Sequence, residues 1–524
     1  MRKHHSGKGP KRQWHNANRR VPDACTNLVK SLCDGIPGGT VATDYLRSEY
    51  LSKFNGKGTV SPAERRDAAI RKWREIEQLN AGTNARLRGL NRGYNVLPRI
   101  SLYRFLEVCQ RIIRNILGPL HDELVLGSFT GGASTSRRRT DSHPAEKFCG
   151  RADVTTGAQP YIDLIHRLSA VYREYQFGYS LREVVGAELF TVPKKTEIDR
   201  CACKEPDINM FLQKGVGRHI RRRLRRVGID LNDQSTNRRL AKRGSIEGDL
   251  ATIDLSSASD TVTRSCVLAL LPLDWYLYME DIRSQCVKVE GQFRKVNMFS
   301  SMGNGFTFEL ESLLFYALAR ATAYLRGHVG IISVYGDDII VPSGMYDDFT
   351  WVLEVFGFRV NPDKSFSTGS FRESCGGHYD NGIDITPFYL RREPTHLTDV
   401  IRVCNQLRLW ATTELRQYEI PGLYELWLGM ANFVPRDLWG GFDPVLDTQL
   451  VSVGPSKNRL SRIADDRPVP EVGRYLHWQT NTRNRGRDVD VESPFPPVED
   501  TRKCRRRPSK PGAVAFELLF REEW

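Results

Sequence analysis

The sequence predicts an α+β fold with an antiparallel sheet, and three kinds of pattern support this prediction. Two apolar runs, 329–334 and 339–341, flank a Tyr-Gly-Asp-Asp turn, as in a β-hairpin. A further apolar run at 250–255 has the length of a buried strand. Residues 102–117 and 398–420 have apolar side chains at helical spacing, so helices are expected on both sides of the β-rich centre.

The composition is that of a globular, basic protein. The chain has 524 residues, of which 40% are hydrophobic and 27% charged, enough for several subdomains around a substantial core. A net charge of +15 and a pI near 9.3 favour a polyanionic partner, because lysines and arginines gain affinity by releasing counterions from phosphates. The alternative is a basic surface that serves solubility alone.

Cysteine spacing and hydropathy argue against zinc knuckles, disulfides and membrane insertion. The 11 cysteines show no paired CxxC spacing, and Cys201 and Cys203 are too close together for a zinc knuckle. We therefore expect reduced thiols, as in a cytoplasm, with these two in structural roles. No apolar stretch is long enough to span a membrane. Residues 1–20 are polar and basic without the apolar core of a secretory signal, and we expect a mobile arm there.

The turn of the predicted hairpin carries two adjacent carboxylates. Gly336 occupies the first central position of a two-residue loop, where a type II′ turn requires positive φ. Side chains at a turn can reach the same point in space, so Asp337 and Asp338 are candidate site residues. The alternative is an ordinary solvated turn, because Gly and Asp are common turn residues.

A third carboxylate, Asp254, lies near the end of the predicted buried strand. Serines follow it and are expected to cap a helix, so that Asp254 stands where a strand gives way to a helix. Beside the hairpin, each carboxylate pair at about 4 Å would repel by about 4 kcal/mol at an effective dielectric near 20. Such a cluster requires cations. Oxygen ligands favour Mg²⁺ or Mn²⁺, and two such ions activate the attacking and leaving oxygens of a phosphoryl transfer.

These residues resemble the catalytic motifs of template-dependent RNA polymerases. Asp254 with Asp260 is similar to motif A, the stretch 300–312 to motif B, and the Tyr-Gly-Asp-Asp turn to motif C, in the expected order. The detailed resemblance is to the replicase catalytic (β) subunit of the leviviruses, which are small positive-strand RNA phages. It is strongest over 186–392 and is carried by five stretches: 190–205, 228–235, 253–261, 301–312 and 371–375.

The resemblance implies a right-hand polymerase fold of fingers, palm and thumb, with an antiparallel palm sheet. Four regions are expected, with part of 280–300 belonging to the fingers. They are an N-terminal region and outer fingers at 1–125, fingers with a basic channel at 126–245, a palm at 246–392, and a thumb with a basic tail at 393–524.

The resemblance also assigns the catalytic residues. Asp254, Asp337 and Asp338 are expected to hold two Mg²⁺ ions, for which Mn²⁺ or Ca²⁺ can substitute, with Leu255 as a further ligand. Lys364, in a stretch similar to motif D, is expected to protonate the departing pyrophosphate. This role requires a proton donor within hydrogen-bond reach of the leaving group.

A basic stretch, 192–205, is similar to motif F, which lines the channel for the incoming nucleotide. An NTP brings about four negative charges, which fixed cations must offset. Lys194 and Arg200, with Lys195, are therefore expected to contact the triphosphate.

Ribose reading is expected from Asp260, Ser301 and Asn304. The motif B stretch departs from the commoner polymerase pattern here, because Met302 precedes the glycine and Glu311 occupies the place of an asparagine.

The run 218–226 is expected to be a helix with cations around most of its circumference, suited to tracking an RNA backbone. Four of its arginines are the candidate RNA contacts: Arg218, Arg221, Arg222 and Arg225. The alternative is a plain solvated helix.

The activity implied by the resemblance is RNA-directed RNA synthesis with a primer-independent start at a CCA-ended template. The implied partners are template and product RNA, NTPs, host elongation factors Tu and Ts, and a host small-subunit ribosomal protein, in the cytoplasm of a bacterial host. A reverse transcriptase and a non-catalytic RNA-binding scaffold on a degenerate polymerase fold are the two alternatives. Retention of all three candidate metal carboxylates argues against the scaffold.

Overall fold

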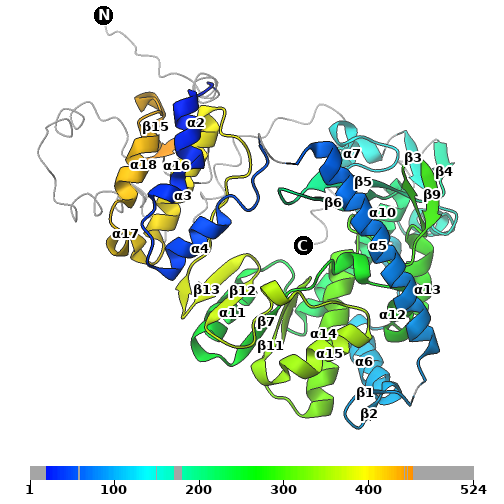
Figure 1. The fold of residues 1–524 in the computed structure, drawn as a ribbon. Coiled ribbons are helices and arrows are strands. Elements are labelled where there is room, and N and C mark those ends of the chain that lie inside the picture. Colours follow the sequence, from blue (N-terminus) through cyan, green and yellow to red (C-terminus); the bar gives the residue numbers. More distant parts are fainter. Residues whose placement is uncertain are drawn as a thin grey trace, which may run out of the picture. The chain divides into compact units, whose positions relative to one another are not determined.

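The computed structural model describes residues 19–452 apart from 57–59, 92, 149, 170–179, 442 and 445–446. Nearly all of the expected N-terminal arm and the basic C-terminal tail therefore lie outside the described residues. The chain divides into two compact units (Figure 1). Unit 1 comprises Met1–Ser61, Lys195–Glu197 and Ile383–Arg505, and unit 2 comprises most of the remaining chain, from Pro62 to Gly382.

Unit 1 is mainly helical. Its helices, 3₁₀ turns and short strands are α2 (Asp23–Lys30), α3 (Leu32–Gly35), α4 (Val41–Glu49), β14 (Ile383–Asp384), α16 (Leu397–Thr412), η6 (Thr413–Leu415), α17 (Arg416–Glu419), α18 (Leu423–Ala431), η7 (Arg436–Leu438), β15 (Trp439–Gly441) and β16 (Leu450–Val451). The expected helix at 398–420 ends early, because Glu414 adopts a positive φ of 51° that interrupts the helical backbone.

Unit 2 combines helices with several small sheets, which confirms the α+β class. Its helices and 3₁₀ turns are α5 (Pro62–Gly89), α6 (Leu102–Leu117), η1 (Asp122–Val125), η2 (Arg139–Asp141), α7 (Pro144–Lys147), α8 (Tyr161–Leu168), α10 (Asp207–Arg225), α11 (Ser235–Glu247), η3 (Ser259–Thr261), α12 (Arg264–Leu270), α13 (Leu273–Ile282), α14 (Thr307–Arg326), η4 (Ser343–Met345), α15 (Tyr346–Val355) and η5 (Pro362–Lys364). Its strands are β1 (Asn95–Leu97), β2 (Ile100–Ser101), β3 (Arg151–Val154), β4 (Ser180–Glu183), β5 (Ala187–Pro193), β6 (Asp199–Lys204), β7 (Leu250–Ile253), β8 (Cys286–Val289), β9 (Gln292–Lys295), β10 (Ser333–Tyr335), β11 (Asp338–Pro342), β12 (Phe371–Ser374) and β13 (Gly377–Asp380).

Helix α6 confirms the helix predicted at 102–117. The Ser101 hydroxyl accepts a hydrogen bond from the Arg104 amide at 3.3 Å and caps the first turn, while Gly118, with φ of 70°, ends the helix. Its apolar face packs against α14, which is buried along most of its length and forms the centre of the main hydrophobic core.

The central sheet has the order β10-β11-β7, and both pairings are antiparallel. All four residues of β7 are buried, as predicted for the run at 250–255, although the strand ends at Ile253. Strand β10 begins only at Ser333, because the chain before it is exposed, with Val329 93% accessible.

The expectation that serines cap a helix directly after Asp254 is wrong. The segment forms a turn, with Ser257 at a positive φ of 57°, and then the single 3₁₀ turn η3. The next helix, α12, starts at Arg264, and its cap is Thr263, whose hydroxyl accepts from the Cys266 amide at 3.4 Å. Leu255 still forms an antiparallel bridge with Val360, and the turn begins at Ser256.

The cysteines in the described part of the chain are free, as expected of reduced thiols. Cys201 and Cys203 are buried in an apolar cluster with Trp73 and Val287, which supports their structural role. Among the described helices, none is both long and apolar enough to cross a lipid bilayer.

Candidate active site

The antiparallel pairing of β7 with β11 brings two of the predicted carboxylates together. Ile339 pairs with Ile253, and the same register continued by one position would set Asp338 opposite Asp254; the charge of Asp254 also raises the pKa of Asp338, so the two carboxylates are close. Directly opposed residues of an antiparallel pair have Cβ atoms about 4.5–5.5 Å apart. Asp337 occupies the hairpin loop beside them, between Gly336 and Asp338.

The hairpin turn has the predicted conformation. Gly336 has a positive φ of 62° and Asp337 does not, as a type II′ turn requires. A Cβ atom on Gly336 would lie 2.5 Å from the ring of Phe308, so both the backbone angle and the packing require glycine. The Gly336 amide donates to the Ser312 hydroxyl at 2.9 Å, which ties the turn to α14.

The three carboxylates influence one another electrostatically. Burial raises the pKa of Asp338 to about 6, and the charges of Asp337 and Asp254 raise it further, against hydrogen bonds that lower it. Burial also raises the pKa of Asp254, and Asp337 again adds to the rise. A bound cation would offset this repulsion.

The donor set suits a hard cation, because every side chain in the cluster offers carboxylate oxygen. Among the described residues, however, no group of three or more His, Cys, Asp or Glu side chains is arranged to hold a metal ion. Mg²⁺ is commonly held by one or two carboxylates, with water and substrate phosphates as its other ligands. The carboxylates of this cluster could therefore hold Mg²⁺ together with a bound nucleotide. The side chain of Leu255 lies in the hydrophobic core, so only its carbonyl oxygen is available as a ligand.

Neighbouring segments hold two of the carboxylates in place, and the sequence did not predict these contacts. The Asn361 side-chain amide donates to Asp254 Oδ2 at 2.9 Å. The Cys375 amide and the Ser374 hydroxyl donate to Asp338 Oδ1 at 2.8 and 3.3 Å. All three partners come from beyond the hairpin, where no periodicity signals a role next to the aspartates.

Lys364 lies beside the same cluster. Its ammonium group forms an ion pair with Glu373 Oε1 at 2.8 Å, and its charge lowers the pKa of Asp254. The Lys364 side chain is 43% exposed, so the ammonium group remains accessible from solvent. Glu373 is a further site residue that sequence reasoning missed.

The predicted nucleotide contacts gather around Asp260. Burial raises the pKa of Asp260 to about 6, while the charges of Arg200 and Lys194 lower it. Both cations belong to the β5–β6 hairpin, in which Val192 pairs with Arg200. Lys195 belongs to unit 1, and its assignment to the triphosphate stays a prediction.

The glycine-containing loop before α14 packs against β6. The Cys203 amide donates to the Met302 carbonyl at 2.8 Å, and a Cβ atom on Gly303 would collide with the carbonyl of Cys203. Ser301 and Asn304 are both buried in this loop. The Asn304 Nδ2 group is buried without a hydrogen-bond partner among the described residues, which is uncommon for a buried donor.

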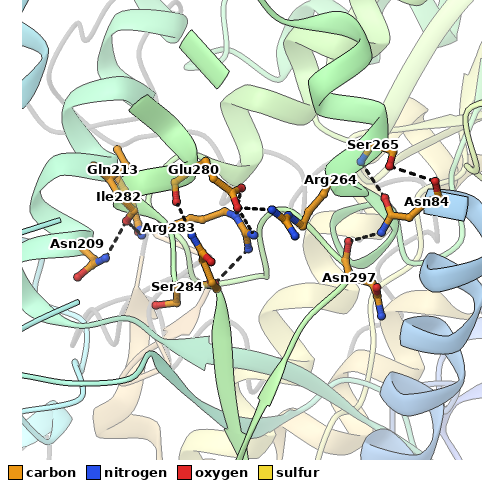
Figure 2. A network of polar contacts seen from close by, with 11 residues as sticks. Asn84, Asn209, Gln213, Arg264, Ser265, Glu280, Ile282, Arg283, Ser284 and Asn297 are labelled. Atoms are coloured by element: carbon orange, nitrogen blue, oxygen red, sulfur yellow. Dashed lines mark hydrogen bonds and ion pairs between the residues drawn. The ribbon is translucent and has the colours of Figure 1, made fainter. Parts of the chain in front are cut away.

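The polar network drawn in Figure 2 contacts this loop through Gln213. The Gln213 side chain accepts from the Gly305 amide at 2.9 Å and donates to the Ile282 carbonyl at 3.0 Å. Figure 2 shows Glu280 between the guanidinium groups of Arg264 and Arg283, at 2.6 Å from each. Glu280 and Arg283 are buried as a pair, and Gln213 links the loop to the carbonyl of Ile282.

Glu311 brings a fourth carboxyl group close to the site. It is 3% exposed and accepts from the Ser259 hydroxyl at 3.1 Å. Burial raises its pKa well above the ordinary range, and the charges of Asp337 and Asp260 raise it further.

The arginines of α10 differ in their exposure and in their contacts within the chain, which the sequence did not predict. The expectation of cations around most of the circumference is wrong, because Ile220 and Leu224 bury one face in the core. Arg221 is bound within the chain: its guanidinium lies 2.7 Å from Glu309 Oε1 and packs over the ring of Phe308. Arg218 donates to the Leu126 carbonyl.

Arg222 and Arg225 are both exposed. Arg225 pairs with Asp230 at 3.2 Å, but its side chain is 71% accessible. Exposed pairs of this kind contribute little and exchange readily for a phosphate. Of the four arginines, these two are therefore the most available to RNA.

We expect Arg222→Ala with Arg225→Ala to reduce the slope of log affinity for RNA against log salt by roughly two, since each lost phosphate contact removes roughly one. Arg221→Ala should instead lower the free energy of unfolding by about 2–4 kcal/mol, because Glu309 is left buried without its partner. Salt titrations of RNA binding and denaturant unfolding measure the two effects. A reduced slope for Arg221→Ala without loss of stability would show that Arg221 contacts RNA.

A family model described as "RNA replicase, beta-chain" matches residues 37–500. The RNA-directed RNA polymerase beta chain of Escherichia phage MS2 is 40% identical over 470 residues, covering 83% of this chain and 84% of the relative. The corresponding chain of Enterobacteria phage fr is 41% identical, with 82% and 79% covered. The RNA-directed RNA polymerase subunit beta of Escherichia virus Qbeta is 36% identical, with 85% and 77% covered.

Among solved structures, the RNA-dependent RNA polymerase of a human picorbirnavirus aligns with 48% of this chain and 58% of its own, at 15% identity and a TM-score of 0.35.

Proposed function

The chain belongs to the RNA replicase beta-chain family and is an RNA-directed RNA polymerase, and we propose that it replicates a positive-strand RNA phage genome by two-metal nucleotidyl transfer. The observation that carries the mechanism is the meeting of Asp254 and Asp338 across the β7–β11 pair, with Asp337 in the adjoining turn. Three mutually repelling carboxylates at the end of a sheet fit a cation site in which a phosphoryl group is transferred.

Asp254 and Asp338 would hold one Mg²⁺ ion, and Asp254 with Asp337 would hold the second. Bound there, the ions would favour ionisation of the attacking 3′-hydroxyl and offset the charge of the departing pyrophosphate. Mn²⁺ or Ca²⁺ would fit the same oxygen ligands.

The chain's own groups position the nucleotide and move a proton. Lys194 and Arg200 would bind the triphosphate beside Asp260, whose pKa they already lower. Asp260, Ser301 and Asn304 would contact the ribose, with the unsatisfied Nδ2 of Asn304 as a donor. Lys364, whose charge acts on Asp254, would give a proton to the pyrophosphate as it leaves.

The proposal includes a right-hand arrangement, with fingers within 1–245, a palm at 246–392 and a thumb from 393 onward. The family suggests a primer-independent start at a CCA-type 3′ end in a bacterial cytoplasm. It also suggests a complex with host elongation factors Tu and Ts and a host small-subunit ribosomal protein.

We expect the purified chain to incorporate labelled NTPs but not dNTPs on a CCA-ended RNA, weakly alone and strongly once elongation factors Tu and Ts are added. A partner that binds only the active form stabilises it by mass action. Incorporation should be compared for both nucleotide classes, with and without the two factors. Preference for dNTPs would favour a reverse transcriptase, and no incorporation under any condition would favour a scaffold. Full activity of the isolated chain, unchanged by the factors, would contradict the host-factor part alone.

A further inference from the structure

A cavity of about 520 Å³ lies within unit 2, between α5, the turn that follows Asp254, and the end of α15. Its volume falls in the range of about 300–1,000 Å³ typical of small-molecule sites. None of the residues assigned above to the metal ions, the triphosphate or the ribose lines it. The cavity therefore adjoins the predicted nucleotide site, where the charge of Lys72 also lowers the pKa of Asp260, but it shares none of the residues assigned there.

The lining of this cavity combines cations with aromatic rings. Lys72 and Arg359 are exposed there, and within the described residues neither forms a salt bridge. Trp351 and Tyr94 also line it and are 48% and 37% accessible, so their rings can contact a ligand. Glu354 is the single carboxylate of the lining. Aromatic faces beside unpaired cations match the chemistry of a base joined to phosphates.

The cavity also touches the segment that carries Asp260. Ser257, which holds a positive φ of 57°, lines it, and the neighbouring Ser256 amide donates to the Arg359 carbonyl at 2.8 Å. Asn80, also in the lining, donates to the Asp260 carbonyl at 2.7 Å. A ligand in the cavity would therefore bear on the turn between Asp254 and Asp260.

We propose that this cavity binds a second nucleoside triphosphate, with its base against Trp351 and its phosphates on Lys72 and Arg359. The site goes beyond the proposed catalytic function and does not depend on the metal assignment. A single nucleotide is favoured over an RNA strand because the cavity has room for about one nucleotide. Of its cationic side chains, that of Arg86 donates to the Val355 carbonyl, which leaves those of Lys72 and Arg359 for phosphate. A nucleotide bound in the cavity would contact the turn between Asp254 and Asp260. It would thereby change nucleotide binding at the catalytic site.

The test is the binding stoichiometry of radiolabelled α,β-methylene-ATP, measured by equilibrium dialysis on the full chain with Mg²⁺ and without RNA. We expect two equivalents for the unmodified chain and one for Lys194→Ala with Arg200→Ala. The double variant Lys72→Ala with Arg359→Ala should also bind one equivalent, because the affinity of the cavity for the nucleotide should fall about 100-fold or more. The matched control is Arg71→Ala with Arg88→Ala. Both arginines are exposed on α5, the helix that carries Lys72, but lie outside the cavity, so this variant should still bind two equivalents.

One equivalent in the unmodified chain, lost in the Lys194 and Arg200 variant, would overturn the proposal. So would an unchanged result for the Lys72 and Arg359 variant. Displacement of the cavity ligand by short single-stranded RNA, but not by ATP, would assign the cavity to RNA and also overturn it. If the Lys194 and Arg200 variant also bound two equivalents while the Lys72 and Arg359 variant bound one, the cavity proposal would stand and the triphosphate assignment would fail.

Discussion

Replacing Asp338 by Asn is expected to abolish nucleotide addition, by about 10³-fold or more, which corresponds to about 4 kcal/mol in the activation barrier. The change removes a metal-ligand charge but almost no volume. Asn Oδ1 can still accept from the Cys375 amide, which now lies 2.8 Å from Asp338 Oδ1, so the local fold should persist. Single-turnover extension of a labelled RNA in Mg²⁺ measures the loss, and Asp254→Asn should behave likewise.

Stability separates this catalytic role from a structural one. Burial and neighbouring charges raise the pKa of Asp338 to about 6, so at neutral pH, above this pKa, the ionised carboxylate lowers the stability of the metal-free fold. The neutral amide does not carry this cost, so Asp338→Asn should unfold at the same or a higher temperature without metal. Asp274→Asn, on the exposed first turn of α13, is the control. Extension by Asp338→Asn at near the parent rate would refute the assignment.

Lys194→Ala and Arg200→Ala are each expected to lower kcat/KM for NTPs about 10- to 100-fold, mainly through KM, while template affinity changes little. The estimate follows from hydrogen bonds to charged groups, which contribute about 1.5–3 kcal/mol each. Both cations act on Asp260 in the structure, which supports contact with the nucleotide rather than with the template. Steady-state kinetics with varied NTP concentration measure the effect on the nucleotide, and a separate RNA-binding titration measures the effect on the template.

The matched control for these variants is Arg294→Ala. Arg294 lies on β9, an exposed strand of the same four-stranded sheet as β5 and β6. Loss of one surface charge there should leave KM for NTPs unchanged. Equal losses of NTP and template affinity in the Lys194 and Arg200 variants would contradict the division of roles.

Local patterns were sufficient for much of the site. The hairpin with Gly336 at its first loop position, the buried strand before Asp254 and the helix at 102–117 all follow from residues within a few positions of one another. Turn geometry, side-chain alternation and helical spacing are short-range properties, so a single sequence contains them. The serine-rich turn after Asp254 was mispredicted because capping residues also favour turns.

The sequence by itself determined which side chains are candidates for the chemistry: the aspartates of the turn and of the strand end, the cations near 194–200, and the glycines of the loop before α14. Only the tertiary structure decided their partners. Asp254 meets Asp338 and Asn361, and Arg221 meets Glu309, across separations of many tens of residues. Such pairs form because whole strands and helices bury their apolar faces together, and the free energy of that burial depends on the entire core rather than on any local segment.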